Sequence, residues 1–284
     1  MIVYYHKNCN DGSAAALAAW LAHPDATFIA VNYGTDPSPD DYRNEHVYIL
    51  DFSWPASTIT LMAEDAYSIT ILDHHKTAEM ELAQLQLHNV MVTFDMTQSG
   101  AMLAWKHFHP NKGVPELIRN IQDRDIWTRE MPWSDHISRA LMLHRDWRQW
   151  APYLDNTSQL IHEGSVLLEA QNLHIQSLIA HLKPSVLEVY NRDGVRSQYF
   201  DIPIINVPAF MISDTLHALL QKFPEASFAA GFNIVEYPNV YQWSLRSSDD
   251  REDVALIARN MGGGGHRNAA GFRSRFLHGR HAPV

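Results

Sequence analysis

The sequence is poor in cysteine, in positive charge and in long apolar runs. Cys9 is the single cysteine among 284 residues, which excludes an internal disulfide and leads us to expect a reducing compartment, the cytoplasm. No run reaches the roughly eighteen apolar residues of a membrane span, and the N-terminus lacks the basic start and apolar core of a signal peptide. The formal net charge of −10 argues against a protein that coats long nucleic acid, although it leaves a small phosphate-bearing substrate open.

The first half of the chain alternates strand and helix patterns. Apolar runs predict strands at 2–5, 27–33, 47–50 and 67–72. Helical patterns occupy 13–22, 55–65, 99–107, 114–122 and 137–143. Such alternation is typical of an α/β fold with a parallel sheet covered by helices, in which ligands bind at the carboxyl ends of the strands.

The second half begins with a long amphipathic helix predicted over 158–182 and ended by Pro184. Strands are then predicted at 186–190, 202–207, 228–235, 240–245 and 271–276, with a turn at Pro238-Asn239 and helices at 215–222 and 253–260. We therefore expect three parts: a metal-binding catalytic domain (1–150), a helical linker (151–185) and a smaller α/β substrate-binding domain (186–284).

Five polar residues lie at or just after predicted strand ends: His6, Asp11, Asp51, Asp73 and His74. Buried unpaired charges cost several kcal/mol, so a fold keeps such residues only where something satisfies them. Helix capping would explain Asp11, and a turn or helix cap would explain Asp51. Taken together, histidine and aspartate form a nitrogen and oxygen ligand set that suits Mn²⁺ or Mg²⁺ and is rich enough for two ions.

Two later segments also carry candidate functional residues. Asp123 and Asp125 flank Arg124 and could complete a metal site, or could form surface ion pairs. Gly262–Gly265 could bring backbone N–H groups close to an anion, unless the run is simply a flexible loop. His266, Arg267 and Arg246 would add phosphate contacts. Aromatic side chains that could stack on bases, or belong to the core, are Trp127, Trp133, Tyr237 and Trp243.

In this order the segments resemble the DHH phosphoesterase superfamily with its associated C-terminal domain, in its oligoribonuclease and dinucleotide phosphodiesterase branch. Leu72-Asp73-His74-His75 matches the naming motif, and Gly262–His266 with Ala269-Ala270-Gly271 matches the C-terminal signature. The resemblance implies two Mn²⁺ ions, with Mg²⁺ as the alternative. Its implied ligands are His6, Asp11, Asp51 as the bridge, His74, and Asp125 rather than Asp123. It gives Asp73, His74 and His75 catalytic or supporting roles, and phosphate binding to Gly263, Gly264, Gly265, His266 and Arg267, with Arg246 nearby.

Cys9 is a departure from this family pattern, which usually has an aspartate at that position. Either Cys9 binds as a thiolate or one metal has a protein ligand fewer, and a thiolate would favour zinc or iron. The occupancy and identity of one metal are therefore left open by the sequence.

The resemblance implies a hydrolase of short nucleotides, such as linear pGpG or nano-RNA, that releases mononucleotides. The alternatives are a cyclic-dinucleotide phosphodiesterase, a pyrophosphatase-like hydrolase of small phosphates, and a non-catalytic nucleotide sensor. The expected partners are a short nucleotide and neither long nucleic acid nor membrane, and the resemblance is compatible with a homodimer.

Overall fold

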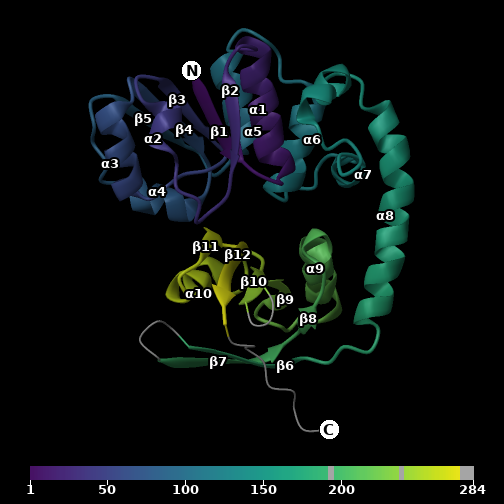
Figure 1. Ribbon diagram of the computed structural model, residues 1–284. Coiled ribbons are helices and arrows are strands. Elements are labelled where there is room, and N and C mark those ends of the chain that lie inside the picture. The colour runs from purple at the N-terminus through teal and green to yellow at the C-terminus, as the bar shows by residue number, and fades with distance from the viewer. Residues whose placement is uncertain (191–194, 237–239, 276–284) are drawn as a thin grey trace. The chain divides into compact units, whose positions relative to one another are not determined.

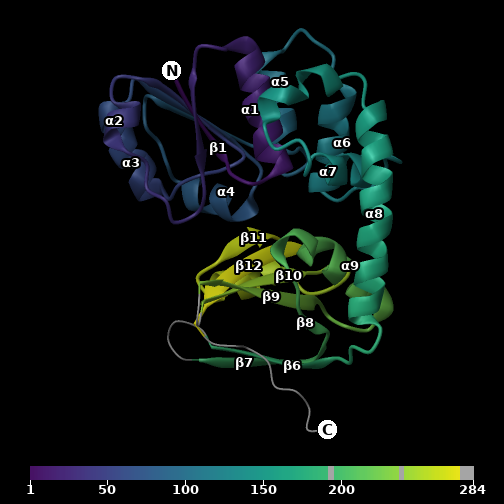
Figure 2. The same cartoon turned by 45° about the vertical axis from the view of Figure 1, so that its right-hand side comes forward.

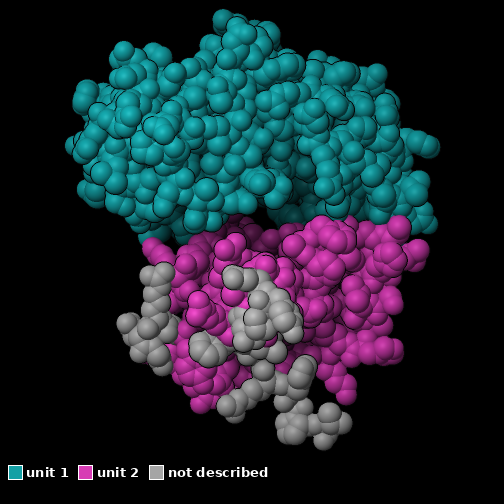
Figure 3. Space-filling model, in the orientation of Figure 1, with its two compact units in different colours: residues 1–169 teal, residues 170–284 magenta. Residues whose placement is uncertain are grey.

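The computed structural model describes residues 1–190, 195–236 and 240–275 (Figure 1). The expected turn at Pro238-Asn239, Tyr237 and the expected strand end at Phe276 lie outside the described residues. The chain divides into two compact units, Met1–Glu169 and Ala170–Val284 (Figure 3). The division falls inside the long helix α8 (Ser158–Ile179), within the range 151–185 that the sequence assigns to a linker.

The first unit is built on a parallel sheet of five strands in the order β2-β1-β3-β4-β5. The strands are β1 (Ile2–His6), β2 (Thr27–Val31), β3 (His46–Leu50), β4 (Ser68–Asp73) and β5 (Val90–Phe94). All four pairings between neighbours are parallel. The predicted α/β fold class with a parallel sheet is therefore confirmed, although the sequence pattern did not predict β5.

Helices cover both faces of this sheet (Figures 1 and 2). Val3 and Leu50 pack with α1 (Asn10–Ala22) and α5 (Gly100–Phe108), whereas their neighbours Tyr4 and Ile49 pack with α3 (Ala56–Asp65) on the opposite face. Successive strand residues point to opposite faces, so a sheet covered on both sides needs apolar residues in succession. The remaining helices of the unit are α2 (Pro39–Tyr42), α4 (Lys76–Leu82), α6 (Glu116–Asp125), α7 (Ser134–Ala140) and the 3-10 helix η1 (Trp147–Tyr153).

The second unit contains a five-stranded mixed sheet and a two-stranded ribbon. The mixed sheet has the order β11-β12-β10-β9-β8, and β6 pairs with β7 in the ribbon. Its strands are β6 (Ser185–Tyr190), β7 (Arg196–Ile202), β8 (Ile204–Asn206), β9 (Ala229–Glu236), β10 (Val240–Arg246), β11 (Gly264–His266) and β12 (Ala269–Ser274). Its helices are η2 (Ala209–Met211), α9 (Ile212–Lys222) and α10 (Val254–Asn260). The expected hairpin of β9 and β10 is present as an antiparallel pair.

The single strand predicted at 202–207 is wrong. The chain instead ends β7 at Ile202 and starts β8 at Ile204, and these two strands belong to different sheets. Pro203 lies between them and has no N–H to donate to a ladder, which explains the break. No helix in the described part of the chain is long and apolar enough to cross a membrane.

Candidate metal centre

Three neighbouring strands of the first unit's sheet have polar residues at their carboxyl ends. His6 is the last residue of β1, Asp51 directly follows β3, and Asp73 is the last residue of β4. Because β1, β3 and β4 are adjacent and parallel, their carboxyl ends meet. Open parallel sheets bind their ligands at the carboxyl ends of their strands.

Asp51 is the central carboxylate at these strand ends. It is 1% exposed, and its backbone has a left-handed φ of 55°. Residues other than glycine rarely adopt this conformation, because it is strained. Strained backbone conformations occur preferentially at functional sites. Its Oδ1 lies 3.2 Å from Nε2 of His74, and its Oδ2 lies 3.5 Å from Nδ1 of His6. The two oxygens of Asp51 therefore face two different histidines.

Three groups of three metal-competent side chains in the first unit contain or adjoin Asp51. One is Asp51, Asp73 and His75, and the other two hold the ligands that the sequence predicts. The first triad is His6, Cys9 and Asp51, and the second triad is Asp11, His74 and Asp125. Within each triad the ligand atoms all lie within 4.8 Å of one another. The structure thus brings together every residue for which the sequence suggested metal binding, apart from Asp123.

The first triad fits a divalent cation. Nδ1 of His6 and Oδ2 of Asp51 are buried and have no hydrogen-bond partner within the described part of the chain. Leaving a buried polar atom unsatisfied costs about 1–3 kcal/mol, so such atoms are uncommon without a bound water or ion. A cation held by the nitrogen, sulfur and oxygen donors of this triad would satisfy both atoms.

Asp11 in the second triad is anchored by the N-terminus of α5. Its Oδ2 accepts a hydrogen bond of 2.6 Å from the N–H of Gly100, and its Oδ1 accepts one of 2.9 Å from the N–H of Ala101. A Cβ at Gly100 would lie 2.5 Å from the Cβ of Asp51. Sequence reasoning missed these contacts, for which the only signal is the capping residue Ser99 in front of a glycine.

Burial and mutual charge shift the pKa values of this cluster. Burial and the carboxylates of Asp51 and Asp125 raise the pKa of Asp11 well above its usual range. Burial also raises the pKa of Asp125, against the opposing effect of His74. Burial would raise the pKa of Asp51 too, but the nearby His6, the hydrogen bond to His74 and the charges of both histidines hold it well below its usual range. Three crowded carboxyls, of which those of Asp11 and Asp51 are buried, are suited to a cation.

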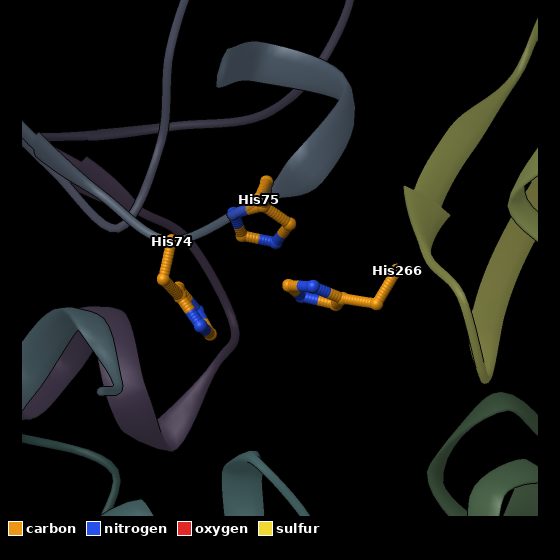
Figure 4. Close-up of side chains that lie close together, drawn as sticks. All are labelled: His74, His75 and His266. Atoms are coloured by element: carbon orange, nitrogen blue, oxygen red, sulfur yellow. The ribbon is translucent and has the colours of Figure 1, made fainter. Parts of the chain in front are cut away.

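Asp73 and His75 form a tightly bound pair beside the triads. Oδ1 of Asp73 accepts hydrogen bonds from the N–H of His74 at 2.7 Å and of His75 at 3.2 Å, and lies 2.7 Å from Nδ1 of His75. Its Oδ2 accepts a hydrogen bond of 2.8 Å from Ser53. The rings of His74 and His75 leave consecutive residues just beyond β4, with centroids 4.8 Å apart (Figure 4). Asp73 thereby fixes the orientation of His75.

Asp123 and Asp125 have different surroundings on α6. Oδ2 of Asp125 lies 3.4 Å from Nε2 of His74. Asp123 instead accepts hydrogen bonds from Thr128 and from the N–H of Glu130 in the loop after α6. Asp125 is therefore a candidate metal ligand, whereas Asp123 stabilises the loop after α6.

Aromatic residues lie at different depths in the two units. Trp127, with a left-handed φ of 65°, lies between the guanidinium groups of Arg124 and Arg129, at 4.1 and 4.2 Å from its centroid. Tyr33, which sequence reasoning missed, is 53% exposed and has its ring centroid 5.6 Å from that of His6. Trp243 is 0% exposed in the core of the second unit, so for this residue the core alternative is confirmed and base stacking is excluded.

The glycine run of the second unit is part of a strand rather than an open loop. Gly264–His266 form β11, which pairs with β12 at the edge of the mixed sheet. A Cβ at Gly263 would lie 2.0 Å from the carbonyl oxygen of Gly271, so the glycines allow close packing of the backbones. This agrees with the Ala-Ala-Gly sequence on the facing strand.

The basic residues around β11 differ in their contacts. His266 and Arg246 both lie opposite Ala269, on its two neighbouring strands. Arg246 donates a hydrogen bond of 2.7 Å to Ser213. The guanidinium of Arg267 donates to the carbonyl oxygens of Asp249 and Arg251, so these donors support the fold of the second unit.

Comparisons with known proteins found relatives by sequence and by structure. No family model matches the chain. The uncharacterized protein R106 of Acanthamoeba polyphaga mimivirus is 30% identical over 294 aligned positions, and the chain covers 66% of its length while 95% of this chain is aligned. The pGpG-specific phosphodiesterase PggH from Vibrio cholerae has a TM-score of 0.51 at 14% identity, covering 96% of this chain and 92% of that chain.

An exopolyphosphatase-related protein from Bacteroides fragilis has a TM-score of 0.52 at 13% identity, covering 97% of this chain and 87% of that chain. The chain has the DHH phosphoesterase fold. In this DHH fold, the naming triplet Asp73-His74-His75 follows β4 directly, beside both triads. The motif that gave the resemblance is therefore located at the candidate metal centre.

Proposed function

We propose that this chain is a metal-dependent DHH phosphoesterase that hydrolyses short linear nucleotides, such as pGpG and nano-RNA, to mononucleotides. The observation that carries the proposal is Asp51, whose two oxygens face the histidines of two ligand triads. Such an arrangement is suited to a pair of cations that share one carboxylate. The similarity of fold to a protein named as a pGpG-specific phosphodiesterase supports the choice of substrate.

The proposed cofactors are two divalent cations. Mn²⁺, with Mg²⁺ as the alternative, suits the second triad, because oxygen donors predominate there. When bound, a pair of such ions activates a water and stabilises the charge of an in-line phosphoryl displacement. Asp51 would hold the two positions at a fixed spacing, and the α5 N-terminus would fix Asp11. Without these buried contacts the ligands would not be preorganised.

His75 is the proposed contact to the phosphate in the first unit. Asp73 holds its Nδ1 side and raises its pKa, although burial alone would lower it. A protonated imidazole in a fixed orientation can donate a hydrogen bond to a phosphate oxygen or supply a proton to a leaving group. His74 would serve as a ligand instead, because Asp51 and Asp125 surround its Nε2.

The second unit is proposed to bind phosphate groups of the substrate through Arg246 and His266. Both residues lie opposite Ala269 in neighbouring strands of one sheet. β11 is at the edge of that sheet, so one side of its glycine-rich backbone has no strand partner among the described residues. Imidazole, guanidinium and backbone N–H groups together are typical of phosphate sites.

Product analysis with Mn²⁺ tests this proposal. Purified protein is incubated in parallel with pGpG, a short linear RNA, a cyclic dinucleotide and pyrophosphate. We expect conversion of pGpG and the short RNA to mononucleotides, with little opening of the ring. Faster attack on the ring would indicate a cyclic-dinucleotide phosphodiesterase, and pyrophosphate as the preferred substrate would indicate a small-phosphate hydrolase. Tight nucleotide binding without any product would indicate a sensor.

Asp51→Asn is the matched variant for this experiment. Asparagine keeps the size of the side chain and tolerates a left-handed φ, so the backbone at this position is preserved. We expect kcat to fall by more than the roughly 10–100-fold that residues supporting a metal ligand typically cost. Activity within a few-fold of the unaltered protein would refute the role of Asp51 as the shared ligand.

A further inference from the structure

Cys9 lies at the start of α1 within the first triad. It occupies the N-cap position of the helix, with φ −123° and ψ 137°. Its Sγ and the ligand atoms of His6 and Asp51 are all within 4.8 Å of one another. The turn between His6 and α1 is closely packed, because a Cβ at Gly12 would lie 2.4 Å from the carbonyl oxygen of His6. The sulfur is therefore held at the site by the backbone that also carries His6.

A second observation points to a ligand at the same place. Asp51 is 1% exposed, and its Oδ2 has no hydrogen-bond partner among the residues that the structure describes. That oxygen is directed toward His6, at 3.5 Å from its Nδ1. A buried carboxylate oxygen, an imidazole nitrogen and a sulfur with this spacing make a cation site rather than an ordinary helix cap.

The two triads differ in the chemistry of their donors. The first offers nitrogen, sulfur and oxygen, whereas the second offers one nitrogen and two carboxylates. Thiolate donors favour zinc and ferrous iron, and carboxylate donors favour manganese and magnesium. Equal occupation of both positions by Mn²⁺ is therefore not what the donor sets favour.

We propose that Cys9 binds as a thiolate and makes the first position selective for a borderline-soft cation such as Zn²⁺ or Fe²⁺, while the second position takes Mn²⁺ or Mg²⁺. The protein would then carry two different metals. In forming the sulfur–metal bond, the thiol releases its proton to solvent, and no oxidant or reductant is involved. The inference rests on the metal centre proposed above and does not depend on which phosphate ester is cleaved.

Substitution with Co²⁺ gives a readout that is independent of turnover. A thiolate bound to Co²⁺ produces an intense charge-transfer absorption in the near ultraviolet, which oxygen and nitrogen ligands do not give. Cys9 is the only cysteine of the chain, so any such band must come from it. We expect the band on titrating the full-length metal-free protein with Co²⁺, and we expect Zn²⁺ to displace it far more effectively than Mn²⁺.

Three variants assign the band and the selectivity. Cys9→Asp should remove the band while keeping a metal, Cys9→Ser should remove the band and weaken the position, and Asp125→Asn should leave the band in place. After dialysis against equal Zn²⁺ and Mn²⁺, metal analysis should find a Zn:Mn ratio at least about tenfold lower in Cys9→Asp than in the unaltered protein. Circular dichroism checks that each variant is folded.

Absence of the band from protein that has bound Co²⁺ would overturn the proposal, as would a band that persists in Cys9→Asp or an unchanged Zn:Mn ratio. If Cys9→Asp does not fold, the ¹¹³Cd resonance of the unaltered protein decides, because sulfur ligation moves it well downfield of an oxygen and nitrogen site. A band without hydrolysis would support this inference and count against the proposed function. Hydrolysis with Mn²⁺ and no band would support the proposed function and contradict ligation by Cys9.

Discussion

Asp123 shows that a carboxylate close to the metal centre can be purely structural. Its Oδ1 accepts hydrogen bonds of 2.8 Å from Thr128, 2.7 Å from the N–H of Glu130 and 3.2 Å from the N–H of Met131. Burial would raise the pKa of Asp123, but these donors and Ser134 lower it below its usual value. The ionised carboxylate therefore stabilises the loop after α6.

The pH dependence of stability should reveal this role. A carboxyl with a lowered pKa contributes stability above its unfolded value of about 3.9, and this contribution is lost as the pH falls through the folded pKa. Asp123→Asn should lower the free energy of unfolding by about 1–2 kcal/mol near pH 7, and the difference should shrink below about pH 4. Urea unfolding of both proteins between these pH values measures the difference in their free energies of unfolding.

Asp125→Asn is the matched control for Asp123→Asn. It lies two residues further along the same helix and should impair metal binding and turnover, whereas Asp123→Asn should leave the metal content per folded chain nearly unchanged. A pH-independent difference for Asp123→Asn would show that the charge of Asp123 is not what stabilises the loop.

At the residue scale, the sequence could indicate a ligand wherever an apolar run ends in a polar side chain. Asp51, Asp73 and His74 follow such runs, and the structure places all three at one edge. The anchoring of Asp11 could not be predicted, because its partner Gly100 lies 89 residues away. The burial of Trp243 could not be predicted either, because the sequence pattern of a strand does not show whether its tryptophan is buried or exposed.

At the level of elements, the N-terminus of α5 connects the two triads. The amides of Gly100 and Ala101 bind Asp11, and Gly100 also contacts the backbone of Asp51. Gly100→Ala would place a Cβ 2.5 Å from the Cβ of Asp51 and 2.9 Å from its Cα, so α5 or Asp51 would have to move. We expect a loss of about 1–3 kcal/mol of stability and a clear loss of metal affinity, measured by urea unfolding and calorimetric titration with Mn²⁺.

Gly113→Ala is the control for this variant. A Cβ at Gly113 would meet no atom within 4 Å, and the hydrogen bond that its carbonyl oxygen accepts from Trp105 would be kept. Its stability should stay within about 0.5 kcal/mol of the unaltered protein. Equal effects of the two substitutions would contradict the view that α5 positions the ligands by close approach.

The elements that the sequence did not predict are those with weak apolar patterns. β5 is an edge strand whose residues alternate between half-buried and exposed, and β7 is almost entirely exposed. Both are strands because a neighbour pairs with them, which a reading of single segments cannot detect. The central strands β1, β3 and β4 are buried on both faces. Their continuous apolar runs therefore allowed them to be predicted as strands.

At the scale of the whole molecule, all six ligands of the two triads lie in the first unit, between residues 6 and 125. Each unit also has hydrophobic clusters of its own: Leu160 of α8 belongs to one in the first unit, and Ile175 and Ile179 belong to one in the second. The sequence predicted two globular parts, but the sheet order needed long-range pairings that no local pattern carries.

Removal of metal should therefore destabilise the first unit. Binding to the folded state alone adds about 2.7 kcal/mol when the free cation is at 100 times its dissociation constant. We expect a chelator to lower the unfolding temperature, and hydrogen exchange to accelerate around β1, β3, β4 and α6. The strands β9 and β10 serve as the internal reference in the same experiment. Exchange that changes equally in both units would contradict a metal centre confined to the first.

The distribution of the ligands along the chain also has a kinetic consequence. The six side chains of the two triads come from four separate segments of the chain, and they meet where the neighbouring strands β1, β3 and β4 are paired. Parallel pairing requires contacts between distant residues and is slow, and an unfolded chain offers no preformed site for an ion. A cation that binds after the folding barrier has been crossed leaves the folding rate unchanged and slows unfolding alone.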